Sequence, residues 1–89
     1  MADTKERELD TQEVEALAQI ERDGRALTAL IEDLSSSSRR TRQFSARVVA
    51  ILAQREPKLL DPYVSDLIDA LYRPEAQTRW EVLDALSEL

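Results

Sequence analysis

The sequence predicts an all-α protein built as a short stack of antiparallel helical hairpins, with about five helices. Three observations support this fold class. Glycine occurs once and proline three times in 89 residues, whereas the helix-favouring residues alanine, leucine, glutamate and arginine are abundant. Apolar residues recur at helical spacing along most of the chain. The chain also matches itself after a shift of 37 residues, and a period in this range is typical of stacked helical hairpins.

Identical residues at helical positions define the internal repeat. The matching pairs are Leu30 and Leu67, Ile31 and Ile68, Leu34 and Leu71, Thr41 and Thr78, Arg42 and Arg79, and Leu52 and Leu89. Units of this size cannot bury their apolar faces alone, so neighbouring units pack side by side. Arrays of this kind commonly hold other macromolecules, which makes binding the predicted class of function.

The N-terminus is predicted to lead into the first helix. Residues 1–9 are charged and lack apolar periodicity, so we expect them to be disordered or frayed, ahead of one helical domain over residues 10–89. Asp10 is the expected N-cap of the first helix, and Glu13 lies three residues later as its capping-box partner. This helix forms the N-terminal end of the stack.

The first hairpin is predicted over residues 25–54. Asp23 and Gly24 separate it from the first helix. The four serines at positions 35–38 are expected to end its first helix, because serine side chains compete for backbone hydrogen bonds. Its second helix, residues 39–54, has a broad apolar arc, which predicts that neighbours cover it on both sides.

The second hairpin is predicted over residues 57–89. Asp61 and Pro62 are expected to start its first helix, with Asp61 as N-cap and Pro62 at the first helical position, where a missing N–H costs nothing. Pro74 is expected to start the last helix. The connections are short, so consecutive helices should be antiparallel.

The turns of both hairpins resemble those of HEAT repeats. The two stretches are Leu34-Ser-Ser-Ser-Ser-Arg-Arg-Thr-Arg42 and Leu71-Tyr-Arg-Pro-Glu-Ala-Gln-Thr-Arg79, and each places an arginine eight residues after the leucine. Residues 57–63 also resemble the lead-in to the first helix of a HEAT repeat. The resemblance covers about residues 25–89, some two repeats. It implies a short HEAT-like α-solenoid in which the second helix of each hairpin contacts partners.

The resemblance does not extend to one contact of that family. There an Asp in the turn typically pairs with the Arg of a neighbouring repeat, whereas Ser36 and Arg73 stand at this turn position here. Arg42, repeated as Arg79, is interpreted as a helix-packing residue rather than a ligand. The residue preceding each of these two arginines is threonine where the family has valine.

Differences between the two copies predict that the last helix faces water. Phe44 and Ile51 of the first copy become Glu81 and Glu88 of the second. The last helix thereby acquires a polar stripe, which consists of Gln77, Glu81, Asp84 and Glu88. We interpret this stripe as a cap that ends the stack, so that the chain would be a complete object. The alternative is an array that continues in a longer chain, which would leave the leucines at 83, 86 and 89 partly bare and favour a homodimer.

Charge is distributed unevenly along this acidic chain, whose net charge is −6. Residues 39–58 carry six basic residues and one acidic residue, between two acidic segments. Arg39 and Arg40 fall in the first turn of a helix, where the helix dipole disfavours cations. Glu32 and Asp33 could neutralise them across the turn; alternatively, the arginines and serines form an anion site.

Composition excludes several classes of chemistry. The chain has no cysteine and no histidine, which removes disulfides, thiolate nucleophiles and the usual transition-metal ligands. The 18 acidic residues are interpreted as solvated surface, so we expect no enzyme activity, no cofactor and no metal. No apolar run approaches the roughly 20 residues that span a bilayer. The polar start is unlike a signal peptide, and we therefore expect a cytoplasmic protein that does not enter membranes.

The predicted function is a non-catalytic protein-interaction or scaffold module. The residues expected to bind the partner are Arg39, Arg40, Gln43, Arg47 and Trp80. The arginines would steer the partner electrostatically, Gln43 would donate or accept hydrogen bonds, and Trp80 would act as an aromatic anchor. One alternative is a self-associating structural module. A less favoured alternative is an anion or nucleic-acid module using Arg39 and Arg40, because most of this acidic chain would repel a nucleic acid.

Overall fold

The computed structural model describes residues 9–89, and all regular structure in this range is helical. In chain order the elements are α1 Thr11–Arg22, α2 Gly24–Asp33, α3 Arg39–Arg55, the 3-10 helix η2 Pro57–Tyr63, α4 Val64–Ala70 and α5 Ala76–Ser87. The predicted all-α class is confirmed. The predicted disorder of residues 1–8 lies outside the described residues. Leu9, the last residue of the predicted frayed segment, is partly buried and packs against the core.

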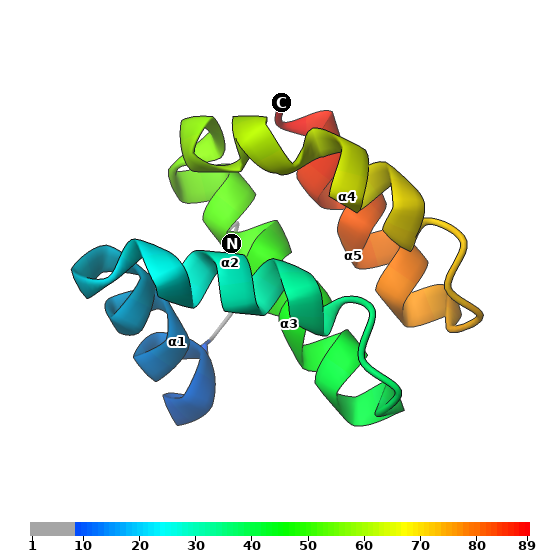
Figure 1. Ribbon diagram of the computed structural model, residues 1–89, viewed down its shortest axis with the longest axis horizontal. Coiled ribbons are helices and arrows are strands. Elements are labelled where there is room, and N and C mark those ends of the chain that lie inside the picture. The colour runs from blue at the N-terminus through cyan, green and yellow to red at the C-terminus, as the bar shows by residue number, and fades with distance from the viewer. Residues whose placement is uncertain (1–8) are drawn as a thin grey trace, which may run out of the picture.

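Two antiparallel helical hairpins follow α1. Helices α2 and α3 form the first, α4 and α5 form the second, and Figure 1 shows α3 and α5 running in the same direction. The contact between α3 and α5 is the most extensive between any two elements, and α1 packs on both α2 and α3. The second helices of the two hairpins therefore form the interface that joins the hairpins.

Side-chain caps set the starts of the first three helices. Asp10 accepts a hydrogen bond from the backbone N–H of Glu13 (2.8 Å), and the Glu13 carboxylate accepts one from the N–H of Asp10 (3.2 Å). Asp23 ends α1 and accepts a bond from the second residue of α2 (3.0 Å). Ser38 Oγ accepts from the N–H of Thr41 (3.2 Å). The capping box and the serine-terminated turn confirm the sequence predictions.

The link between the hairpins differs from its prediction. Asp61 and Pro62 lie inside η2, and Tyr63 rather than Asp61 precedes α4. Within η2, which directly precedes α4, Leu60 is fully buried in the core. The hydroxyl groups of Tyr63 and Thr28 form a hydrogen bond (2.9 Å) that ties η2 to α2.

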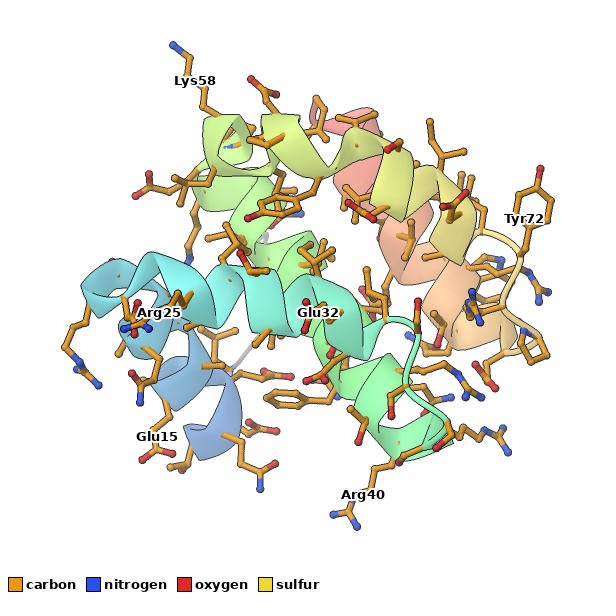
Figure 2. All side chains as sticks on the ribbon, in the orientation of Figure 1. Glu15, Arg25, Glu32, Arg40, Lys58 and Tyr72 are labelled. Carbon is orange, nitrogen blue, oxygen red and sulfur yellow. The ribbon has the colours of Figure 1, made fainter. Side chains whose placement is uncertain are left out.

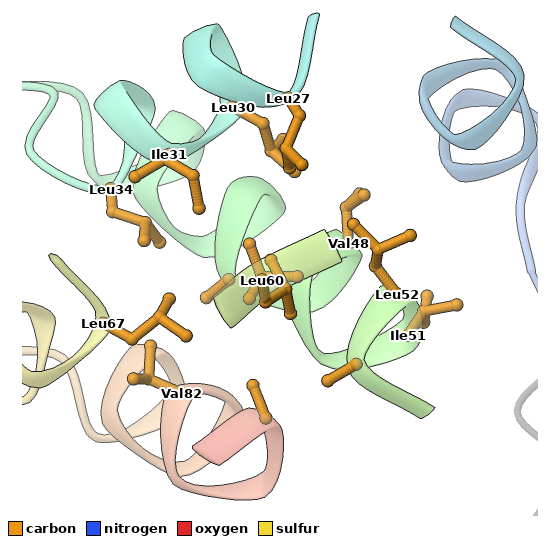
Figure 3. Packing of buried hydrophobic residues seen from close by; sticks show 14 of the residues in the cluster. Leu27, Leu30, Ile31, Leu34, Val48, Ile51, Leu52, Leu60, Leu67 and Val82 are labelled. Carbon is orange, nitrogen blue, oxygen red and sulfur yellow. The ribbon is translucent and has the colours of Figure 1, made fainter. Parts of the chain in front are cut away.

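Helix α3 lies at the centre of the core (Figure 3). Its residues are buried at nearly every position from Ser45 to Ala53, so the predicted broad apolar arc is confirmed. Leu60 of η2, Leu67 of α4 and Val82 of α5 are fully buried in the same cluster. Burying one such side chain contributes about 1.5–3 kcal/mol, so these contacts hold the second hairpin against α3.

Candidate functional site

Arg42 on α3 connects the turns of the two hairpins. Its Nη1 donates a hydrogen bond to the carbonyl oxygen of Ser36 (2.8 Å), in the turn that precedes α3. Its Nε donates to Oε1 of Glu75 (3.0 Å), and its Nη2 pairs with the other carboxylate oxygen. The two side chains are only 13% and 7% exposed. Because Glu75 is the N-cap residue of α5, its charge also interacts favourably with the dipole of that helix.

The ion pair stabilises the charged forms of both groups. The hydrogen bond from Arg42 holds the pKa of Glu75 below its usual value, although burial opposes this shift. The charge of Arg39 lowers the pKa of Glu75 further. The pKa of Arg42 is raised, chiefly by its hydrogen bond to Glu75. Arg42 is therefore a structural residue, as its interpretation from the sequence required.

Arg79 repeats half of this arrangement on α5. Its Nη1 donates to the carbonyl oxygens of Arg73 (2.9 Å) and Pro74 (2.8 Å). Arg73 lies six residues before Arg79, the same separation as that of Ser36 from Arg42. No ion pair joins Arg79 to a carboxylate among residues 9–89. The two copies thus share the contact within the turn, and the first copy adds a contact to the next hairpin.

A groove with polar walls lies between α1, α3 and α5, with a volume of about 880 Å³. Its lining residues include Asp10, Gln12, Glu13, Asp33, Arg40, Thr41, Gln43, Phe44, Arg47, Gln77 and Glu81. Glu13 is fully buried, and its Oε2 lies 2.6 Å from Nη2 of Arg47, so the two charges neutralise each other. Gln77 donates a hydrogen bond to the carboxylate of Glu81 (2.9 Å).

The groove brings together three of the five residues expected to bind a partner. Arg40, Gln43 and Arg47 line it, and the side chain of Arg40 points away from the body of the molecule (Figure 2). Arg47 already forms an ion pair with Glu13. Arg39 and Trp80 are exposed but do not line this groove. The structure therefore separates the predicted site into a groove and an exposed aromatic residue on α5.

Direct ion pairing across the α2–α3 turn is not observed. Glu32 and Asp33 make no ion pair with Arg39 or Arg40 in the described part of the chain, so the expected neutralisation does not occur by contact. Compensation for Arg39 comes instead from Glu75, whose carboxylate interacts with its charge. Arg40 shares the groove with Asp33 without an ion pair.

The second hairpin exposes large apolar side chains that the sequence prediction recognised only in part. They are Ile68 (46% exposed), Tyr72 (82%), Trp80 (64%) and Leu83 (51%). Tyr72 points away from the body of the molecule in Figure 2. The first-copy equivalents of Ile68 and Leu83, an isoleucine at position 31 and an alanine at position 46, are buried. The two isoleucines indicate that coverage by a neighbour, and not residue type alone, decides exposure.

The predicted polar cap on α5 is wrong at its central residue. Glu81 is buried and faces the groove, where it accepts the hydrogen bond from Gln77. The face of α5 that meets water includes Trp80 and Leu83. The error arose because the polar substitution at position 81 was assigned to solvent, whereas a polar groove provides its surroundings.

The described residues show neither a metal site nor a membrane span. Among residues 9–89, no group of three or more acidic residues is arranged to hold a metal ion. Within the same range, no helix has the length and apolar character needed to cross a bilayer.

Comparison with known proteins found no relative for this chain. A scan against family models, a search of curated proteins and a search of solved structures each returned no match. Membership of the HEAT family therefore stays a prediction that depends on the internal repeat and its turns.

Proposed function

We propose that this chain is a HEAT-like helical-repeat module that binds another macromolecule and performs no catalysis. The observation that carries the proposal is the exposure of Ile68, Trp80 and Leu83 on the second hairpin. We call these three residues and Arg79 the outer face. Large exposed apolar side chains are typical of interaction surfaces. Tryptophan is the residue type most enriched among those that dominate binding energy.

The repeated contacts of Arg42 and Arg79 support the HEAT-like part of the proposal. Each arginine donates to a carbonyl oxygen six residues earlier, in the turn of its own hairpin. A structural repeat of about 37 residues explains why the same contact occurs twice. The carboxylate that pairs with Arg42 comes from Glu75 in the next hairpin, two residues after the turn position at which the family places its Asp.

The cations on α3 have a secondary part in this proposal. Arg39 and Arg40 are exposed and can steer an acidic partner, which affects association rate more than affinity. A nucleic acid is not the proposed partner, because the chain carries a net charge of −6 and would repel phosphates beyond this short segment. An enzyme is not proposed, since the buried Glu13 is paired with Arg47 and the chain offers no histidine or cysteine.

Capture by the full chain tests the proposal. Three immobilised proteins are compared after circular dichroism confirms equal helicity: the natural chain, the double variant Trp80→Glu/Leu83→Glu, and Val14→Glu. Val14 is a half-exposed apolar residue on α1, so it controls for a general loss of surface hydrophobicity. We expect proteins retained by the natural chain and by Val14→Glu to be lost by the double variant. Equal retention by all three would refute binding through the outer face.

A further inference from the structure

We propose that the outer face receives a helical hairpin from another polypeptide, whose second helix follows an Asp or Glu that pairs with Arg79. This inference deepens the proposed function and depends on it. It assigns a shape and a charge to the partner: two antiparallel helices with an acidic residue at the start of the second. The internal repeat carries the argument, because the molecule itself contains one example of the same docking.

The example is the docking of the second hairpin onto α3. Arg42, Ala46 and Val49 follow each other at a spacing of four and three residues, which places them on one face of α3. Arg42 on this face contacts Glu75 of the second hairpin, and the other two are fully buried. This face of α3 is thus the surface that accepts a hairpin.

The same face recurs on α5 without its cover. A shift of 37 residues converts Arg42, Ala46 and Val49 into the α5 residues Arg79, Leu83 and Leu86. Leu83 is 51% exposed, and Leu86 is partly buried. On the first helices, Ile31 is buried, whereas its copy Ile68 is 46% exposed. Both helices of the second hairpin therefore expose residues whose equivalents in the first hairpin are buried.

Arg79 also retains the donors that Arg42 uses across the interface. In both arginines, Nη1 donates to the turn of the same hairpin. The Nε and Nη2 of Arg42 form a two-pronged contact with Glu75. The corresponding two atoms of Arg79 form no hydrogen bond with any residue in the range 9–89. A carboxylate placed as Glu75 is would complete a bidentate pair, which has both strength and directional specificity.

Differences between the copies specify the incoming helix further. Leu83 is larger than Ala46, so the partner helix needs small side chains where it meets α5. Trp80 replaces Gln43 beside this face and adds exposed aromatic area. The partner is therefore an amphipathic hairpin with an acidic N-cap and small residues on the contact face of its second helix.

A second folded copy of the chain does not supply such a hairpin. Its own Glu75 is already paired with its own Arg42. The α5 residues Thr78, Val82 and Ala85, which share one helix face, are fully buried in its own structure. Its first hairpin is likewise covered, by α1 on one side and by the second hairpin on the other. A second folded copy is therefore not the proposed occupant.

A covalent probe tests the acceptor face in the intact protein. Residue 89 occupies the place of residue 52 in the repeat, so residues 53–89 are appended directly after Leu89 of the full chain. This keeps the register and brings the appended copy of Glu75 opposite Arg79. We expect the appended segment to fold as helix by circular dichroism, and the whole protein to unfold in one transition at a higher urea concentration than the natural chain.

Charge variants then test the pairing. In the extended protein we change the appended copy of Glu75 to Gln, Arg79 to Gln, or both. Each single change should remove a large part of the increase in urea midpoint. The double change should lower the midpoint by clearly less than the sum of the two single losses. Additive losses would refute the ion pair. A control extension with the same 37 residues in scrambled order should stay unfolded.

Two results would overturn the inference and separate it from the proposed function. An appended segment that stays unfolded would show that the outer face does not accept a hairpin, while capture experiments would still decide whether it binds something else. Sedimentation that reveals a dimer of the natural chain, abolished by Leu83→Glu but not by Val14→Glu, would identify a second copy as the occupant. Equal retention of proteins by the natural chain, by Trp80→Glu/Leu83→Glu and by Val14→Glu in the capture experiment would instead refute the proposed function.

Discussion

The two hairpins have matching residues at many helical positions but different surroundings. The first hairpin packs against α1 on one side and the second hairpin on the other, whereas in residues 9–89 the extensive contacts of the second hairpin are with α3 and η2. Isoleucine accordingly is 6% exposed at position 31 and 46% exposed at position 68. The comparison teaches that a repeat sequence specifies which face can be buried, while the neighbour determines whether it is.

The largest expected effect distinguishes a substitution in the core of the second hairpin from one on its outer face. Leu67 is fully buried and Leu83 is half exposed, although both are leucines of the second hairpin. Leu67→Ala should lower the free energy of unfolding by about 2–5 kcal/mol, because it leaves a cavity. Leu83→Ala should change it by less than about 0.5 kcal/mol. Urea titration followed by circular dichroism measures both, and similar losses would contradict the described burial.

The next effect concerns the ion pair that joins the hairpins. Glu75→Gln removes the charge that Arg42 contacts but keeps one acceptor oxygen, so we expect a smaller loss than that from Leu67→Ala. The pKa of Glu75 is lowered in the folded state, so its contribution is complete above its usual value near 4.5 and is lost as the pH falls through the lowered pKa. The natural chain should therefore lose more stability than Glu75→Gln between neutral and acid pH. Parallel urea titrations over that range measure the difference, and identical curves would exclude a stabilising pair.

A smaller effect concerns α1, the helix that packs on the first hairpin opposite the second hairpin. Asp10→Ala removes the N-cap of α1 and should lower the free energy of unfolding by about 1 kcal/mol. The neighbouring exposed residue provides a matched control, since Thr11→Ala keeps the capping box intact. Amide hydrogen exchange in the first turn of α1 should increase only in Asp10→Ala. Unchanged exchange would show that this cap does not hold α1 in place.

The smallest effect is spectroscopic. Trp80 is the one tryptophan of the chain and is 64% exposed, so its fluorescence reports on α5 alone. We expect its emission maximum and its quenching by acrylamide to change little when urea unfolds the natural chain. The extended protein described above should show a blue-shifted and less quenchable emission, because its appended hairpin covers the outer face. Strong protection of Trp80 in the natural chain would contradict an open face.

Much of the fold follows from local signals in the sequence. The capping box at Asp10, the serine turn and the central burial of α3 were predicted from side-chain chemistry and apolar spacing, and all three are confirmed. Local signals failed where tertiary packing prevailed. Asp61 and Pro62 have the chemistry of a helix start, yet they lie within η2, the 3-10 helix that also places Leu60 in the core.

The candidate site was less predictable, because its parts depend on contacts between hairpins. Arg40, Gln43 and Arg47 share the α3 face that lines the groove, and helical spacing sufficed to group them. Glu75 was not predicted as the partner of Arg42, because it lies two residues after the turn position at which the HEAT pattern has its Asp. The apolar exposure at Ile68 could not be deduced, since an identical isoleucine is buried in the first copy.

Arg42 also bears on how the molecule opens. A single guanidinium donates to the carbonyl group of the first turn and to the carboxylate at the start of α5, so release of either segment breaks hydrogen bonds to Arg42. Local fluctuations that would release one hairpin on its own are thereby suppressed, and the two turns belong to one cooperative unit. Backbone amides that follow these turns, at the starts of α3 and α5, should accordingly exchange with solvent deuterium together rather than in sequence.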